Sequence, residues 1–194
     1  PLSLYVHVPF CNTLCFYCAC NKVITKDHGR SAKYIRYVAR EIDIVSSILE
    51  SDAPVAQLHL SGGTPTFLAR DEMSSLIGHL RGAFPFAPDA EVSIEVDPRT
   101  VTPVRLGFLR EIGFNRISFG VQDFDPDVQE AVHRIQPFEQ VHALMTAARE
   151  SALGGQADCI TARSRRVVSA RLRDPLGLAR KCSESAKCRR VDRL

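Results

Sequence analysis

Short apolar runs and longer amphipathic segments alternate along the first 150 residues of the chain. The short runs predict four strands, at residues 4–8, 55–60, 91–96 and 115–121. The longer segments repeat apolar residues every three or four positions, which is typical of helices, at residues 31–49, 71–84, 104–112, 126–132 and 138–150. Strands that alternate with helices predict an α/β fold with a parallel sheet and right-handed crossovers. A doubly wound sheet and a (β/α) barrel both satisfy this pattern.

Two of the predicted helices have apolar stripes that should face the core. The stripe residues are Tyr34, Val38, Ile42 and Val45 in the first helix, and Met73, Leu76, Ile77 and Leu80 in the second. We expect both stripes to be buried against the sheet.

Polar or glycine-rich features follow each predicted strand. A cysteine-rich loop follows the first strand, and residues 62–65 (GGTP) follow the second. Glu95 lies near the end of the third strand and Gln122 follows the fourth. Both candidate folds gather their chemistry at the carboxyl ends of the strands, so we expect these features to share one site. Glu95 has apolar neighbours on both sides, so we expect it to be buried and hydrogen-bonded.

Charge and aromatic content change after residue 150. Residues 1–150 contain 14 Lys or Arg and 18 Asp or Glu, whereas residues 151–194 contain 11 and 4. All 14 aromatic residues and all six histidines lie before residue 151. We therefore predict a folded core at residues 1–150 and a basic tail at residues 151–194.

The basic tail has two possible origins. Its sequence shows neither clear strand alternation nor a sustained helical stripe. One hypothesis is a frameshifted translation of the same gene, and the alternative is a genuine tail for nucleic acid or another anionic surface. The tail has no aromatic residue to stack on bases, so a nucleic-acid partner is not expected. Its three cysteines, Cys159, Cys182 and Cys188, receive no role.

The composition also bears on location. No apolar run approaches the roughly 18 residues that a membrane helix requires, so no membrane span is expected. The chain begins with Pro1, Leu2 and Ser3, without a charged-then-apolar leader, so no secretory signal is predicted. The absence of methionine at this position indicates that the true N-terminus lies upstream. We predict a cytoplasmic protein.

The segment CNTLCFYCAC, residues 11–20, places four of the seven cysteines within ten positions. Disulfide bonds would require an oxidising compartment, which nothing else in the sequence indicates. A structural zinc site usually combines two short cysteine pairs separated by a loop, and no second pair lies at zinc-finger distance. The third interpretation is a [4Fe–4S] cluster held by three thiolates, and the C-x3-C-x2-C spacing favours it.

Four segments extend this interpretation: LYVHVPFCNTLCFYCACNK, LHLSGGTPTFL, SIEVDPR and RISFGVQDF. Together they resemble oxygen-independent coproporphyrinogen III oxidases of the radical S-adenosylmethionine (SAM) superfamily, from about Leu2 to Glu150. The related haem chaperones share the three cysteines and GGTP but usually have an aromatic residue in place of Cys20, so Cys20 favours the oxidases. The resemblance implies a partial (β/α) barrel of about four parallel strands with flanking helices.

The resemblance also implies cofactors and site residues. Cys11, Cys15 and Cys18 would bind a [4Fe–4S] cluster, and its open iron would bind SAM. The implied SAM contacts are Tyr5, Tyr17, Gly62, Gly63, Thr64, Glu95, Gln122 and Arg134. The implied catalytic residues are Tyr5, His7 and Cys20.

Simpler interpretations of several of these residues stay open. Residues 62–65 would also suit a tight turn between a strand and a helix. Tyr5 and His7 share one face of a strand and would also suit a pair of core residues with polar tips. Arg134 would equally suit a solvated helix, and Asp97 before Pro98 is interpreted as a turn residue.

The resemblance finally implies a reaction. Cleavage of SAM by the reduced cluster yields a radical that removes a hydrogen from the β-carbon of a propionate of coproporphyrinogen III. Loss of CO2 and one electron leaves a vinyl group, and two such events give protoporphyrinogen IX. The expected partners are this substrate and an electron donor such as flavodoxin or ferredoxin, with a monomeric full-length protein.

The family pattern ends before a complete barrel is formed. We therefore interpret the chain as an N-terminal fragment of such an oxidase. The alternatives are a haem-binding chaperone of the same superfamily and an inactive fragment.

Overall fold

The structure is a computed structural model that describes residues 1–49 and 53–158. In chain order its elements are β1 Leu2–Val8, β2 Phe10–Cys11, β3 Val23–Ile24, α1 Gly29–Ile48, β4 Val55–Gly62, η1 Pro65–Phe67, α2 Arg70–Ala83, β5 Phe86–Val96, η2 Pro98–Thr100, α3 Pro103–Glu111, β6 Arg116–Gly120, α4 Pro126–Ala131, α5 Phe138–Glu150 and β7 Gly154–Asp158. The four predicted strands and five predicted helices are all present. Within the described ranges, no helix has both the length and the apolar character needed to cross a bilayer.

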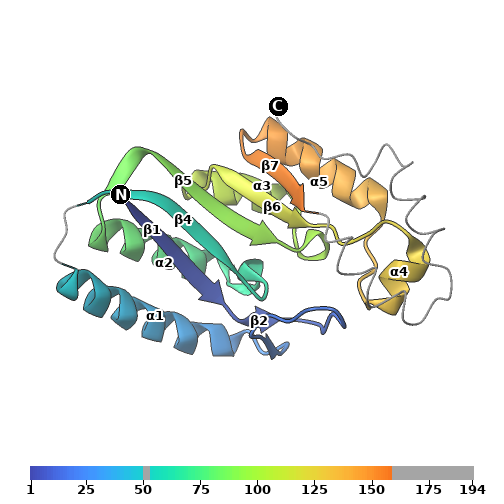
Figure 1. Ribbon diagram of the computed structural model, residues 1–194, viewed down its shortest axis with the longest axis horizontal. Coiled ribbons are helices and arrows are strands. Elements are labelled where there is room, and N and C mark those ends of the chain that lie inside the picture. Colours follow the sequence, from blue (N-terminus) through green and yellow to red (C-terminus); the bar gives the residue numbers. More distant parts are fainter. Residues whose placement is uncertain (50–52, 159–194) are drawn as a thin grey trace.

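The main sheet has five parallel strands in the order β1-β4-β5-β6-β7 (Figure 1). Each new strand is added on the same side of the one before it, and the winding never reverses. A doubly wound sheet requires such a reversal. Right-handed crossovers that keep one direction place the helices on one face of the sheet, as in a (β/α) barrel. The structure therefore decides between the two predicted architectures in favour of an arc of a (β/α) barrel.

The fifth strand, β7, was not predicted. It pairs with β6 in parallel, from Arg116 opposite Gly154 to Gly120 opposite Asp158. Its sequence, GGQAD, contains two glycines and no β-branched or aromatic residue, so neither strand propensity nor a period-two pattern marks it. The sheet thus continues beyond residue 150, where we had predicted the core to end. The hypotheses about the rest of the tail concern residues 159–194, which lie outside the described residues.

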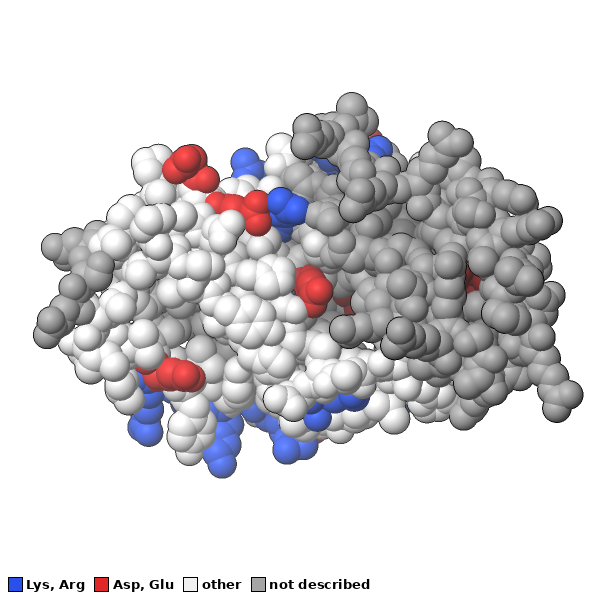
Figure 2. Space-filling model, viewed as in Figure 1, with Lys and Arg blue, Asp and Glu red and all other residues white. Residues whose placement is uncertain are grey.

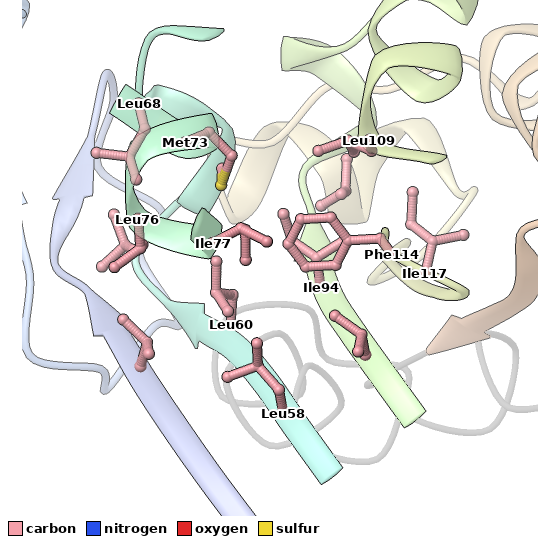
Figure 3. Close-up of a cluster of buried hydrophobic side chains, with 14 of the residues drawn as sticks. Leu58, Leu60, Leu68, Met73, Leu76, Ile77, Ile94, Leu109, Phe114 and Ile117 are labelled. Carbon is pink, nitrogen blue, oxygen red and sulfur yellow. The ribbon is translucent and has the colours of Figure 1, made fainter. Parts of the chain in front are cut away.

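One face of the sheet carries the hydrophobic core (Figure 3). Because side chains alternate along a strand, every second residue of β4, β5 and β6 points toward the helices. The buried strand residues in this core include Leu58, Leu60, Ile94 and Ile117. They meet the predicted stripe of α2, whose members Met73, Leu76, Ile77 and Leu80 are each at most 3% exposed. The prediction for this helix is confirmed.

Helix α1 differs in part from its prediction. Val38 and Ile42 are buried as expected, whereas Tyr34 is half-buried and Val45 is exposed. Ile35 is buried, because it lies three residues before Val38 on the same side of the helix. Basic side chains gather along the lower edge in Figure 2, where Figure 1 places α1. The basic residues exposed on α1 are Arg30, Lys33, Arg36 and Arg40.

The opposite face of the sheet is polar. Strand pairing aligns Tyr5 with His59 and His59 with Ser93, and His59 Nδ1 lies 2.8 Å from Ser93 Oγ. Further along the strands, Ser61 Oγ donates a hydrogen bond to Glu95. Parallel strands covered by helices on both faces are usually apolar throughout. The alternation seen here is therefore that of a sheet covered by helices on one face only, as in a barrel wall.

Candidate functional site

The cysteine loop is closed at its base by a second, two-stranded sheet. Strands β2 and β3 are parallel and pair Phe10 with Val23 and Cys11 with Ile24. Val23 N also donates to Pro9 O at 2.7 Å. The loop therefore leaves and re-enters the fold at one place, directly after β1. This closure holds the cysteines at the carboxyl end of the main sheet.

The tip of the loop is fastened to the segment after α4. Phe16 N donates to Val132 O at 3.1 Å, and His133 Nδ1 lies 2.9 Å from Leu14 O. A carbonyl oxygen can only accept, so His133 Nδ1 is the donor. The His133 ring also stacks on Phe16, with 5.2 Å between the ring centroids. The loop is thus held between β1 and α4.

Gly62 and Gly63 are explained by the close approach of β4 to β1. Gly62 has a φ of +112°, in the left-handed region that favours glycine, and a Cβ there would lie 2.7 Å from the His7 ring. A Cβ on Gly63 would lie 2.7 Å from the backbone of Pro9 and Phe10. Packing alone therefore accounts for both glycines. The same packing brings the backbone of residues 62–64 beside the cysteine loop.

One cavity collects most of the predicted site residues, although they are far apart in the sequence. The predicted residues that line it are Cys11, Cys15, Tyr17, Cys18, Cys20, Gly62, Gly63, Thr64, Glu95, Gln122 and Arg134. In the described part of the chain, no three His, Cys, Asp or Glu side chains are close enough together to hold a single metal ion. The cysteines thus border the cavity without meeting at one point.

The four cysteines of the loop have different surroundings. Cys15 is buried, Cys11 and Cys18 are half-buried, and Cys20 is exposed. Burial raises the pKa of the Cys11 thiol, although a hydrogen bond from Thr64 Oγ1, at 3.5 Å, opposes this shift. Desolvation also raises the pKa of Cys20, with a further contribution from its hydrogen bond to Cys18. Metal binding at Cys11 therefore has to displace a proton.

Asp97, Arg99 and Arg134 form a charged cluster beside Cys15. Arg99 Nη2 lies 2.6 Å and Arg134 Nη1 lies 3.4 Å from the same oxygen, Asp97 Oδ2. The same two nitrogens lie 3.6 Å and 3.7 Å from Cys15 Sγ. Arg134 Nη2 also donates to Gly120 O at 2.7 Å. Arg134 is only 8% exposed, so its interpretation as a solvated helix residue is wrong.

Asp97 is a turn residue, as predicted, but it is also part of this cluster. Its Oδ1 accepts from Arg99 N at 3.0 Å and caps η2. Burial alone would raise the pKa of Asp97, but the hydrogen bond from Arg99 and the charge of Arg134 outweigh it, so the pKa is lowered. Burial alone would lower the pKa of Arg99, but its pairing with Asp97 leaves that pKa raised.

Sequence reasoning did not select Asp97 or Arg99 as site residues. The available signal was the charged pair in VDPR, directly after the apolar end of the third strand.

Two further predicted site residues, Glu95 and Tyr17, also line the cavity. Glu95 was expected to be buried, and this is wrong: it is exposed, because it points to the polar face of the sheet. Its expected hydrogen bond is present, from Ser61. Tyr17 packs against Val128 and Val132. Burial raises the pKa of Tyr17 despite the opposing charge of Arg134, so its hydroxyl stays protonated at neutral pH.

Tyr5 and His7 lie on the polar face beside the cavity and do not line it. Tyr5 OH lies 3.1 Å from His7 Nδ1, and His7 Nε2 lies 2.9 Å from Asn21 O. Because a carbonyl only accepts, Nε2 carries the hydrogen, and Nδ1 of the neutral ring accepts from Tyr5. Tyr5 is 58% exposed, so its interpretation as a core residue is wrong. The pair is linked to the cysteine loop through Asn21.

Comparison with known proteins adds independent evidence. Residues 5–161 match the family described as the radical SAM superfamily. The chain is 52% identical over 151 residues to the oxygen-independent coproporphyrinogen III oxidase of Pseudomonas aeruginosa, covering 77% of this chain and 33% of that protein. It is 47% identical over 150 residues to the enzyme of the same name from Escherichia coli, with the same coverage. The chain thus spans about a third of the length of these curated relatives.

The fold is shared with a solved structure. Coproporphyrinogen III oxidase (HemN) from Escherichia coli, a radical SAM enzyme, superposes with a TM-score of 0.78 at 45% identity, covering 82% of this chain and 37% of that one. The resemblance inferred from the four sequence segments and the partial barrel are both confirmed. From the family match over most of its length, the chain belongs to the radical SAM superfamily.

Proposed function

We propose that this chain is the radical SAM core of an oxygen-independent coproporphyrinogen III oxidase, an oxidoreductase of porphyrin biosynthesis. The relatives it is similar to carry that name, and the chain spans about a third of them, so the activity is proposed for the full-length protein. One observation carries the proposal. Three cysteines at the predicted spacing border the same cavity as residues 62–64, Glu95 and Arg134.

Cys11, Cys15 and Cys18 are the proposed ligands of a [4Fe–4S] cluster. Iron–sulfur clusters are held by thiolates, and three thiols around one cavity provide that donor set. The nearby guanidinium groups of Arg99 and Arg134 suit the negative charge that such a cluster and its thiolates bring. Cys20 borders the same cavity but is exposed, and we propose a catalytic role for it instead of ligation.

The remaining predicted residues are proposed to bind SAM. The backbone of Gly62, Gly63 and Thr64 lies open to the cavity and would receive the amino group. Arg134 offers a guanidinium, which suits a carboxylate. The proposed SAM contacts are Tyr5, Tyr17, Gly62, Gly63, Thr64, Glu95, Gln122 and Arg134. When bound, cluster and SAM supply a one-electron cleavage that yields a radical, and the protein supplies orientation and excludes water.

The polar face of the sheet is proposed to receive the porphyrinogen. The Tyr5 hydroxyl donates to His7, so its oxygen lone pairs remain available on the open face. His59 and Ser93 lie in the same row and add polar groups that would orient a propionate. Tyr5 and His7 are therefore the proposed catalytic residues on the substrate side.

The reaction consumes an electron for each cleavage, so the proposal includes a small electron-transfer protein, a flavodoxin or a ferredoxin. A cluster with an open iron and four thiols in one loop suits a reducing compartment, and we propose the cytoplasm.

Anaerobic reconstitution of this chain with iron and sulfide tests the cofactor part. The expected result is about four iron and four sulfide per chain, the content of one [4Fe–4S] cluster, and an electron paramagnetic resonance (EPR) spectrum that changes when SAM is added. Uptake of zinc instead of iron, or a spectrum indifferent to SAM, contradicts the proposal.

The substrate part requires the full-length protein. Incubation with coproporphyrinogen III, SAM and a reductant should yield the divinyl product, detected by mass spectrometry. Tight haem binding without vinyl formation would instead identify a haem chaperone.

A further inference from the structure

Cys15 differs from the other cysteines of the loop in what surrounds its sulfur. It is 8% exposed, and Arg99 Nη2 and Arg134 Nη1 lie 3.6 Å and 3.7 Å from its Sγ. Cys11 Sγ instead receives a hydrogen bond from the neutral hydroxyl of Thr64, at 3.5 Å. Two cationic donors therefore face one of the three proposed cluster ligands.

Asp97 fixes the orientation of Arg99. Arg99 Nε lies 3.0 Å from Asp97 Oδ1 and 3.1 Å from Oδ2, and Arg99 Nη2 lies 2.6 Å from Oδ2. Asp97 is in turn held by the backbone N–H of Arg99. With Nε and one N–H of Nη2 bound to the carboxylate, the second N–H of Nη2 can donate to the Cys15 sulfur. Side-chain exposures of 22% for Arg99 and 8% for Asp97 leave little water to screen these charges.

We propose that Arg99 is a positioning residue that donates an N–H to the Cys15 sulfur and makes the bound cluster easier to reduce. This inference rests on the proposed function, because it requires a cluster at Cys11, Cys15 and Cys18. Hydrogen bonds to the sulfurs and the surrounding charge are among the factors that set the potential of an iron–sulfur cluster. Reduction adds negative charge, and a cationic donor at sulfur stabilises that state. Arg134 already has a proposed role toward SAM, whereas Arg99 has no other.

The opposite charges of Arg99 and Asp97 predict opposite effects of their removal on the midpoint potential of the iron–sulfur cluster. Arg99→Gln removes a positive charge and the N–H donor, so the midpoint potential should become more negative. Asp97→Asn removes a negative charge, keeps one side-chain oxygen that can accept from Arg99 and leaves both guanidinium groups, so the midpoint should become less negative. A merely structural ion pair would not give shifts of opposite sign. Arg99→Lys retains the charge without the fork and should lie between wild type and Arg99→Gln.

The experiment is an EPR-monitored redox titration of the reconstituted chain without SAM, at equal iron content. For Arg99→Gln we expect the reduced-to-oxidised ratio at a fixed potential to fall about tenfold, which corresponds to about 59 mV for one electron. The matched control is Arg110→Gln, at an exposed arginine that donates to the backbone carbonyl of Phe114, and it should leave the midpoint unchanged.

The outcomes separate this inference from the proposed function. If wild type assembles no cluster, the proposed function fails. If wild type assembles the cluster and Arg99→Gln has the same midpoint, only the role of Arg99 is overturned. Should Arg99→Gln fail to hold iron, Asp97→Asn and Arg99→Lys carry the test. Shifts of the same sign in Arg99→Gln and Asp97→Asn also overturn the inference.

Discussion

On one face of the central sheet, β4 contributes Leu58 and Leu60, and on the other it contributes His59 and Ser61. The first pair is covered by helices and is at most 1% exposed. The second pair lies on the polar face, where His59 contacts Ser93 and Ser61 contacts Glu95. The same strand therefore builds a dry packing surface and a surface suited to polar ligands.

The difference between the faces follows from which elements cover them. Helices on one side exclude water, and apolar side chains there lower the free energy of the folded state. The polar face has no helical cover in the described residues, so polar side chains stay hydrated or hydrogen-bond along the rows. Its carboxyl end adjoins the cavity of the cysteine loop. The polar face and the cavity therefore form one continuous candidate region for cofactor and substrate.

The largest effect is expected at the cysteine loop. Cys18→Ala should abolish assembly of the [4Fe–4S] cluster, because it removes one of three proposed ligands, while Cys20→Ala should retain it. Iron and sulfide analysis after anaerobic reconstitution makes the measurement. Full iron content in Cys18→Ala, or its loss in Cys20→Ala, would mean that the ligand set is wrong.

The contrast between the two faces can be measured with neighbouring residues of β4. Leu58→Ala should lower the free energy of unfolding by about 2–5 kcal/mol, because it leaves a cavity in the core. Gln57→Ala, at an exposed position on the polar face, should change it by no more than about 0.5 kcal/mol. Urea denaturation of the two variants compares them directly. Equal losses would show that both faces are packed alike.

The approach of β4 to β1, which places the cavity, depends on a missing Cβ. Gly63→Ala should lower the free energy of unfolding by about 1–3 kcal/mol, because the new Cβ would overlap the backbone of Pro9 and Phe10. The control is Gly78→Ala in α2, where no atom lies within 4 Å of the added Cβ. This control should gain about 0.5–1 kcal/mol from the higher helix propensity of alanine. A fully stable Gly63→Ala variant would contradict the close approach.

The smallest effect is a pH dependence from Asp97. Its pKa is lowered in the folded state, so its ionisation stabilises the fold above the unfolded-state pKa of about 3.9. This contribution is lost as pH falls through the lower, folded-state pKa. The difference in unfolding free energy between wild type and Asp97→Asn should therefore be constant above about pH 5 and shrink at more acid pH. Denaturation midpoints at several pH values check it.

A matched control for this pH series is Asp89→Asn, at an exposed position. Its unfolding free energy should remain close to that of wild type throughout. A gap between wild type and Asp97→Asn that stays constant down to pH 2 would contradict the assigned role of Asp97.

Local patterns predicted most of the fold and part of the site. The spacing of apolar residues identified four strands and five helices. Parallel strands gather functional residues at their carboxyl ends, and this rule placed the cysteine loop, residues 62–65 and Gln122 at one edge of the sheet. The spacing of apolar residues missed β7, because this strand consists mostly of glycine and polar residues. Its pairing with β6 stabilises it, and its sequence shows no periodic pattern. The helical stripe also failed for Val45, which is 39% exposed and borders a surface pocket beside Leu4 and Phe84.

The sequence by itself determined the short apolar runs of four strands, the stripe of α2, the spacing of the three cysteines and membership of the superfamily. The tertiary structure decided that the sheet winds in one direction as a barrel arc, that Glu95 is exposed, and that Arg99 reaches Cys15. The physical reason is the distance along the sequence between the residues that interact. Periodicity reflects neighbours within one turn or one strand, whereas Arg99 and Cys15 are 84 residues apart and meet only through the packing of β1, β4 and β5.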